Sequence, residues 1–190
     1  MDALELLTAD HNRVRGLFAR YREAEEAEKA DEMATLAEKI VTELEVHTTI
    51  EEEIFYPAVH DMSEELAEVV DEGVEEHHVA KVLIGELATI EAGSDQWKAK
   101  LMVLIENVEH HAEEEEQEMF PQIRSSSDAT TRESLGQKLE ARKSELGAPT
   151  AADAEDLSIG ELRDLAKEQQ IPGRSKMDAE ELRATVDPRG

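Results

Sequence analysis

The chain has no cysteine, few aromatic residues and few basic residues. Without cysteine it can form no disulfide bond, no thiolate metal site and no cysteine nucleophile. Only 3% of its 190 residues are aromatic, and 20 Lys and Arg are set against 47 Asp and Glu, which gives a formal net charge of −27. Such a charge disfavours general binding to nucleic acids or anionic membranes, because it repels phosphates.

Long hydrophobic runs are missing as well. No stretch approaches the roughly 18 consecutive apolar residues that would span a bilayer. The N-terminal sequence MDALELLTADHNRVR lacks the basic and apolar regions of a secretory signal. We therefore expect a cytoplasmic protein with no membrane association. An acidic composition with few aromatics is also typical of disordered proteins. The order of the residues therefore has to show whether the chain is folded or disordered.

Apolar residues recur at intervals of three and four along four successive segments, which is the pattern of amphipathic helices. Breaks between the segments fall near Ala30, from Pro57 to Ser63, at Gly93 and after Pro121. Four long helices with short connections are typical of an up-down-up-down bundle. The sequence therefore predicts an all-α fold with a four-helix bundle over residues 1–125.

A weaker pattern follows the bundle. Residues 126–147 predict one additional helix, and residues 148–156, which are small and polar, are interpreted as a linker. Residues 157–187 predict a small helical module made of two short amphipathic helices joined at Ile171-Pro-Gly173.

Six polar residues lie on the apolar stripes of the predicted bundle. One histidine falls on each predicted helix, and two glutamates each follow a stripe histidine by four residues. Side chains four residues apart share one helix face, so each His–Glu pair points the same way. The six residues are His11, His47, Glu51, His77, His111 and Glu115.

The two halves of the bundle repeat each other. The segment HTTIEEEIFYP in the second helix aligns without gaps on HAEEEEQEMFP in the fourth, and Asp10-His11 matches Glu76-His77 as an acid–His pair. A tandem duplication of this kind predicts a pseudo-symmetric bundle in which the six polar residues meet in the middle.

Carboxylates that face a core are costly unless they are paired or bound to a cation. Two inward glutamates and four inward histidines suit a dinuclear metal site, and imidazole with carboxylate favours iron, with manganese or zinc as alternatives. We predict that the six residues bind two iron ions with an oxo or hydroxo bridge. Open coordination positions would then accept O2, peroxide or NO. The alternative is a metal-free structural or interaction bundle in which the histidines are ordinary core residues.

The other three histidines lie off the stripes. His78 and His110 are neighbours of predicted ligands, but one residue rotates a side chain by about 100° around a helix. We therefore interpret them as surface groups or as outer contacts of the ligands, and we place His60 in a loop. Glu52 and Glu116, which follow the ligand glutamates, are expected mostly in solvent, with contact to a ligand as the alternative.

Tyr21 and Tyr56 are interpreted as packing residues rather than phenolate ligands. The sequence does not identify a general acid, and Glu52, Glu116, Tyr56 and His78 are its first candidates.

Through these residues, positions 1–125 resemble the hemerythrin-like family, also called HHE cation-binding domains. The resemblance rests on His11, on His77 and on the duplicated His-x3-Glu pairs with the segments after them. It implies a four-helix bundle around a non-haem di-iron centre. Such a centre would bind or react with a small oxidant in oxidative-stress response or sensing, either as a peroxide- or NO-consuming oxidoreductase or as a sensor that is not an enzyme. Iron storage or O2 binding without turnover is the alternative.

One position departs from the resemblance. Oxygen-carrying hemerythrins have a second histidine four residues after the ligand of the third helix, where this chain has Lys81. Unless His78, His110 or His60 supplies a fifth imidazole, the departure favours redox reaction or sensing over reversible O2 carriage.

The C-terminal module, residues 157–187, resembles the Rho termination factor N-terminal-like domain, a SAP-like fold. That resemblance implies nucleic-acid binding, with Arg174 and Lys176 as phosphate contacts beside Gly173. Because the module is net acidic, we expect weak or no nucleic-acid binding, and a small cap or a module for a protein partner is the alternative.

Overall fold

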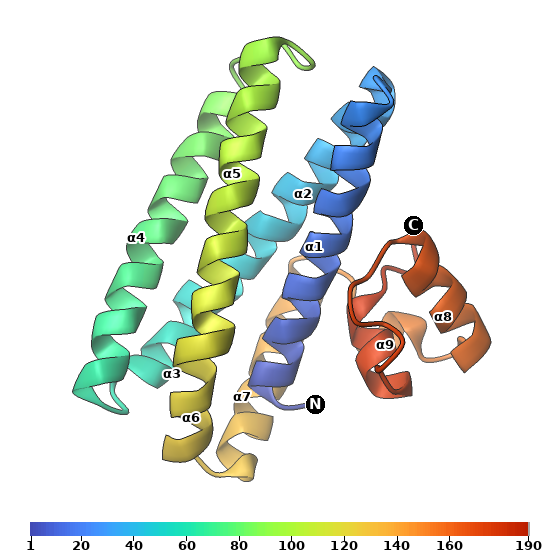
Figure 1. Ribbon diagram of the computed structural model, residues 1–190. Helices are drawn as coiled ribbons and strands as arrows, with labels where there is room; N and C mark the ends of the chain where they lie inside the picture. Colours follow the sequence, from blue (N-terminus) through green and yellow to red (C-terminus); the bar gives the residue numbers. More distant parts are fainter. Residues whose placement is uncertain (190) are drawn as a thin grey trace.

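The computed structural model describes residues 1–189, and the regular structure within them is entirely helical. Four long helices run alternately up and down and form the predicted bundle (Figure 1). They are α1 (Ala3–Glu26), α2 (Ala30–Ile50), α4 (Glu64–Leu87) and α5 (Asp95–Glu114). The predicted all-α class with extra C-terminal helices is confirmed. Within the described range, no helix is long and apolar enough to cross a membrane.

Side-chain caps fix where three of these helices begin. Asp2 caps α1 and forms a reciprocal capping box with Glu5. Ser63 accepts a hydrogen bond from a backbone amide in the first turn of α4, and Ser94 does the same for α5. Each cap satisfies amide groups that have no partner within the helix.

The second and fourth bundle helices do not end at their prolines, as the breaks in the pattern suggest. Instead each passes through one π-helical turn, η1 (Glu51–Phe55) or η2 (Glu115–Met119), and continues as a short helix, α3 (Tyr56–His60) or α6 (Phe120–Ser126). Proline occupies the first turn of each short helix, where its missing N–H costs least. The two halves therefore share a backbone irregularity that begins at the inward glutamate.

A polar layer divides the apolar core of the bundle in two. The first apolar cluster includes Leu7, Ile50, Val70 and Met119, and the second apolar cluster includes Val14, Leu44, Ala80 and Ile105. Along α1, α2, α4 and α5, the last taken together with η2, the stripe histidine lies between a residue of the first apolar cluster and a residue of the second.

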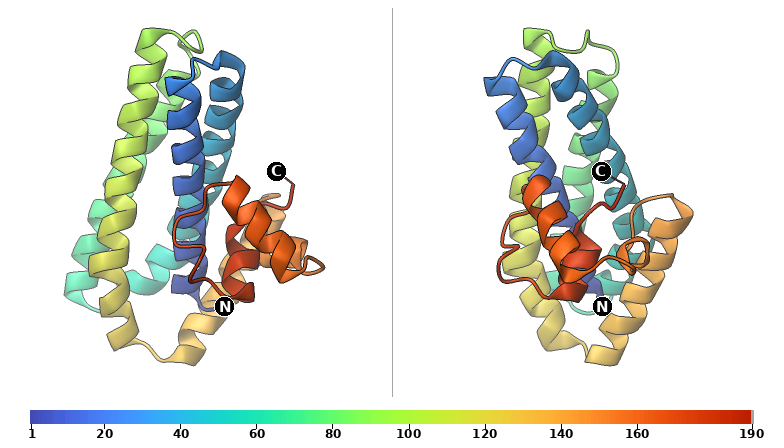
Figure 2. Two further views of the ribbon diagram at one scale, coloured as in Figure 1. Left: turned by 45° about the vertical axis from the view of Figure 1, so that its right-hand side comes forward. Right: turned by 90° about the vertical axis from the view of Figure 1, so that its right-hand side faces the viewer.

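The remaining helices are α7 (Ala129–Glu145), the 3₁₀ helix η3 (Ala151–Ala154), α8 (Ile159–Glu168) and α9 (Ala179–Thr185). Of these, α7 and α9 pack against α1, and η3 and α8 pack against α9. The last three enclose an apolar cluster of their own, which includes Leu162 and Leu182. Figures 1 and 2 show residues 151–189, here called the C-terminal segment, beside α1. The approach is close at Gly16, where a Cβ atom would lie 2.5 Å from the carbonyl oxygen of Gln169. The domain boundaries inferred from the sequence stay predictions.

Candidate metal centre

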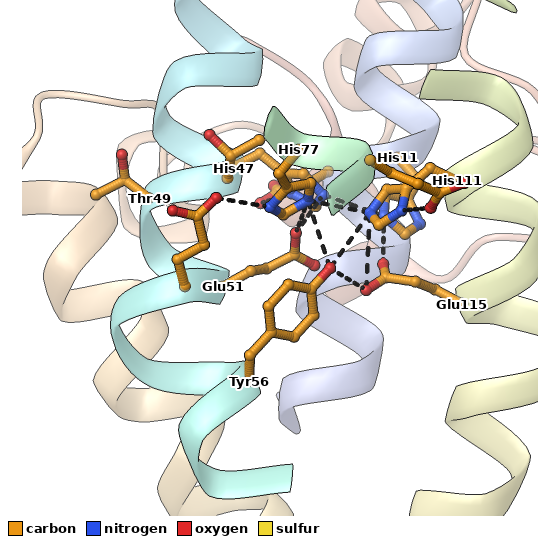
Figure 3. Close-up of polar contacts among 12 residues, drawn as sticks. His11, His47, Thr49, Glu51, Tyr56, His77, His111 and Glu115 are labelled. Carbon is orange, nitrogen blue, oxygen red and sulfur yellow. Dashed lines mark hydrogen bonds and ion pairs between the residues drawn. The ribbon is translucent and has the colours of Figure 1, made fainter. Parts of the chain in front are cut away.

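Four histidine side chains from the four long helices meet in the polar layer (Figure 3). The Nε2 atoms of His11 and His47 lie 3.2 Å apart, and those of His77 and His111 lie 3.1 Å apart. All four side chains are buried. The imidazoles thus form two pairs, one from α1 and α2 and one from α4 and α5, each with its Nε2 atoms directed inward.

Glu51 and Glu115 lie between the two histidine pairs. Glu51 Oε2 is 3.2 Å from Nε2 of His47 and 3.3 Å from Nε2 of His77. Glu115 places Oε2 3.3 Å from Nε2 of His11 and Oε1 3.9 Å from Nε2 of His111. Each carboxylate therefore touches one histidine of each pair, as a ligand that bridges two ions would have to do.

The structure brings all six predicted residues together in two overlapping groups. One holds His11, His47, Glu51 and Glu115, the other holds Glu51, His77 and His111, and within each group the candidate ligand atoms lie within 4.8 Å of one another. Their role as ligands stays a prediction.

Unpartnered oxygens show that this arrangement fits a cation. Neither carboxylate oxygen of Glu51 receives a hydrogen bond in the described residues, and the same holds for Oε2 of Glu115. Both side chains are almost wholly buried, with exposures of 0% and 2%. A buried carboxylate oxygen that accepts no hydrogen bond is costly, and a bound cation removes that cost.

An outer ring of carboxylates holds the histidines from behind. Nδ1 of His11 donates to Glu116 at 2.8 Å, Nδ1 of His77 to Glu52 at 3.0 Å, and Nδ1 of His111 to Glu76 at 2.6 Å. A carboxylate on Nδ1 fixes the ring orientation and leaves Nε2 available to a metal.

From the sequence, Glu52 and Glu116 were expected mostly in solvent, with contact to a ligand as the alternative. In the structure both make that contact, Glu52 with His77 and Glu116 with His11. The sequence repeat singled out Glu76 through the acid–His pair Glu76-His77. In the structure Glu76 does not hold its sequence neighbour His77 but accepts a hydrogen bond from His111 on the neighbouring helix.

The fourth histidine, His47, is held differently. Its Nδ1 lies 3.8 Å from Asp10, too far for a hydrogen bond. Asp10 instead pairs with the buried ammonium group of Lys143 on α7. Arg13, 4.0 Å from Asp10, donates hydrogen bonds to the carbonyl oxygens of Ala184 and Thr185 in the C-terminal segment. This buried ionic network connects the surroundings of His47 to α7 and to the chain end.

Burial and mutual charge set the protonation of the cluster. Burial and the neighbouring Glu115 raise the pKa of Glu51 to about 8. Burial opposes ionisation of Glu115 too, but His111 and His11 hold its pKa below the usual range. Burial and His111 lower the pKa of His77 to about 4, whereas for His11 the carboxylates outweigh burial and raise the pKa to about 9. The metal-free cluster therefore holds protons at neutral pH that an incoming cation would displace.

Tyr56 places a hydroxyl group in the cluster, although the sequence suggested a packing residue. Its Oη donates to Glu115 Oε1 at 3.0 Å and lies 3.4 Å from Nε2 of both His77 and His111. Burial and the two inward carboxylates raise its pKa well above 10, so the phenol keeps its proton. The residue at the matching position of the other half is Phe120, whose ring stacks on His11.

None of the other histidines joins the cluster. His78 and His110 are exposed, and His60, at the end of α3, is 45% exposed beside Asp61. Lys81 occupies the position four residues after His77 where a further histidine was sought, and its ammonium group lies 2.6 Å from Glu52. The cluster contains four imidazoles and no fifth.

Comparisons with known proteins agree with this geometry. A family model described as the hemerythrin HHE cation binding domain matches residues 2–123. A DNA nickase from a Nostoc species is 26% identical over 148 residues, which is 77% of this chain but only 40% of that protein. A crystal structure of a hemerythrin HHE cation-binding domain-containing protein from Mycobacterium kansasii superposes with a TM-score of 0.65 at 22% identity. The superposition covers 97% of this chain and 99% of that one, so the C-terminal segment shares in the similarity of fold.

Proposed function

Because the chain belongs to the hemerythrin HHE cation-binding domain family, we propose that its buried His/Glu cluster holds two iron ions and reacts with a small oxidant. His11 and His47 would hold one ion and His77 and His111 the other, with Glu51 and Glu115 shared between them. When bound, the iron pair would supply one-electron redox chemistry toward O2, peroxide or NO. The observation that carries the proposal is Glu51, whose two buried oxygens lack hydrogen-bond partners midway between the histidine pairs.

The space around the cluster supports a small oxidant. The cavity beside His111 and Glu115 holds about 40 Å³, and those beside His47 hold about 10 Å³ each. Gly73 lines the larger one, and a Cβ atom there would lie 2.9 Å from Tyr56 Oη. Room for one or two water-sized molecules suits O2, NO or hydrogen peroxide and excludes bulky organic substrates.

Tyr56 favours reaction over storage. Reduction of O2 or peroxide consumes protons, and the phenol is a buried donor that keeps its proton at neutral pH. Glu115 orients the hydroxyl by accepting its hydrogen bond. The absence of a fifth imidazole from the cluster points the same way, because it leaves fewer protein ligands around the site.

Metal analysis with an optical spectrum tests the proposal. We expect about two irons per chain and the absorption bands of a bridged ferric pair. The double variant Glu51→Ala/Glu115→Ala should lose most of its iron. Glu53→Ala/Glu118→Ala removes the same charge from exposed positions of the same two π-helical turns, so its iron content should be unchanged. Full iron occupancy in the first variant would refute the ligand assignment.

Turnover distinguishes an enzyme from a sensor or an iron store. Iron-loaded protein should consume hydrogen peroxide or NO over many cycles when a reductant is supplied. A bulky organic hydroperoxide should react far more slowly, because the cavities beside the cluster cannot admit it. Reaction limited to a single cycle would favour sensing or storage.

Nucleic acid is a minor partner at most in this proposal. Arg174 and Lys176 are exposed beside Gly173, which has a φ of +72°, but Asp178 and Glu180 are exposed close by. The name of the Nostoc relative refers to DNA, yet this chain spans only 40% of that protein. Fluorescence anisotropy with labelled DNA should give weak binding that disappears between about 50 and about 200 mM salt. Tight binding at the higher salt would contradict the proposal.

A further inference from the structure

A second cavity lies outside the metal centre, between α1, α2 and the C-terminal segment. It encloses about 320 Å³, against about 40 Å³ for the cavity beside His111. Its volume is at the lower end of the range that holds drug-sized ligands. Both the bundle and the C-terminal segment contribute to its wall, the bundle with Leu17 and Val46 and the segment with Gln169 and Ile171.

Basic side chains gather at this cavity, in contrast to the charge of −27 on the whole chain. Four of the 20 Lys and Arg residues line it, namely Arg13, Arg20, Lys39 and Arg189. The acidic residues that also line it are Glu38, Glu43 and Asp187. The lining therefore carries one more positive than negative charge, within a chain that is otherwise strongly acidic.

Two of the basic groups are compensated, and Arg20 is not. Arg13 pairs with Glu43 at 3.4 Å, and Arg189 pairs with Asp187 at 3.3 Å. Arg20 is partly buried, and over residues 1–189 it makes no hydrogen bond and no ion pair. A guanidinium group without a partner, in a cavity that Leu17 and Ile171 also line, suits a ligand with one negative charge and an apolar body.

We propose that this cavity binds a small organic monoanion, with its apolar part against Leu17, Val46 and Ile171 and its charged group on Arg20. The chemical class is an amphiphilic carboxylate or a comparable monoanion. Because the wall comes from two parts of the chain, the bound ligand would also hold the C-terminal segment on α1. The proposal does not depend on iron at the metal centre.

Calorimetric titration of the full chain with straight-chain carboxylates of eight to twelve carbons tests the site. We expect saturable binding with one molecule per chain. Affinity should rise roughly four-fold with each added methylene until the cavity is full. Octanol, which has the apolar body without the charge, should bind at least about ten-fold more weakly than octanoate.

Two variants separate the charge from the cavity. Arg20→Gln should weaken octanoate binding about ten-fold, whereas Arg124→Gln, at an exposed position of α6 away from the cavity, should leave it unchanged. Thr42→Trp, on an exposed position that lines the cavity, keeps every charge but fills part of the space, and should abolish the gain from longer chains. Thermal unfolding would verify that each variant folds.

The results can overturn the proposal in three ways. The site is absent if none of the carboxylates binds saturably. An anion site is refuted if octanol and octanoate bind equally well, or if Arg20→Gln binds octanoate like the original chain. Resistance of the C-terminal segment to limited proteolysis should increase with dodecanoate, and an unchanged cleavage rate at saturation would refute the ligand's contact with that segment.

Discussion

The two halves of the bundle offer a metal the same donor atoms but surround them differently. Each half supplies two histidines and one glutamate, and each glutamate begins a π-helical turn. The hydroxyl of Tyr56 lies over His77 and His111, whereas the phenyl ring of Phe120 stacks on His11. Both halves therefore have the ligand atoms that metal binding requires. Only the His77 and His111 side also has a proton donor, the hydroxyl of Tyr56.

The supports behind the histidines differ as well. Glu76 is close to His111 and 19% exposed, so water can share its charge. Asp10, the matching residue, is buried, lies farther from its histidine and depends on Lys143. The α1–α2 side is therefore connected to the C-terminal part of the chain, whereas Glu76 on the α4–α5 side is partly exposed to solvent.

The largest expected effect concerns that buried support. Lys143→Met should lower the free energy of unfolding by about 3–5 kcal/mol, because it leaves Asp10 buried and charged with only the more distant Arg13, 4.0 Å away, to compensate it. Glu76→Gln, the change on the solvent side, should lower it by less than about 1 kcal/mol. Urea unfolding measures both. Adding Asp10→Asn to the first variant should restore part of the loss, and equal losses in the two single variants would erase the distinction.

The next effect concerns the hydroxyl group of Tyr56, which lies only on the His77 and His111 side of the cluster. Tyr56→Phe should leave the iron content unchanged and slow peroxide consumption by about 100-fold, the range of general-acid catalysis. Phe120→Tyr, which adds a hydroxyl beside His11, should not speed the reaction. Stopped-flow measurements on iron-loaded protein test both. An unchanged rate in Tyr56→Phe would show that the proton comes from elsewhere.

A smaller effect should be the same in both halves. Glu52→Gln and Glu116→Gln should each weaken metal binding about ten-fold, because each removes the charge that orients a histidine. Competition with a chelator measures the affinity. A large loss for one variant and none for the other would mean that the two ion positions differ in strength.

The last expected effect is a difference in pH dependence between the metal-free His11 and His77. The pKa of His77 is lowered to about 4, so its contribution reduces stability as the pH falls from about 6.5 toward 4. The pKa of His11 is raised to about 9, so its contribution is complete below about 6.5 and is lost as the pH rises toward 9.

Within its pH window, each histidine should change the free energy of unfolding by about 1 kcal/mol per pH unit. Urea unfolding of His11→Gln and His77→Gln across this range should flatten opposite ends of the curve. Parallel curves for the two variants would contradict the assignment.

Helical periodicity made the inner cluster predictable from the sequence. A stripe fixes the direction of every side chain on it, so periodicity alone placed the four histidines and two glutamates on the inner faces of the helices. The direction of Tyr56 could not be predicted in this way, because the π-helical turn that begins at Glu51 widens the helix. In such a turn residues five apart are bonded and stacked, which brings Tyr56 onto the face of Glu51.

Contacts between distant parts of the chain were also beyond the sequence. Lys143 lies on a weakly amphipathic helix and looks like an ordinary surface lysine until α7 is placed beside Asp10. The hydrogen bonds from Arg13 to the chain end join residues more than 170 positions apart. No local pattern encodes such a contact.

The polar layer across the core has a consequence for how the bundle opens. The six buried ionisable residues lie between the first and second apolar clusters. In the metal-free protein they contribute charge repulsion and oxygens without hydrogen bonds instead of dispersion contacts. We expect the two ends of the metal-free bundle to exchange their amide hydrogens as separate cooperative units. A bound pair of ions would merge the two units into one, so the metal would determine how many independently opening parts the protein has.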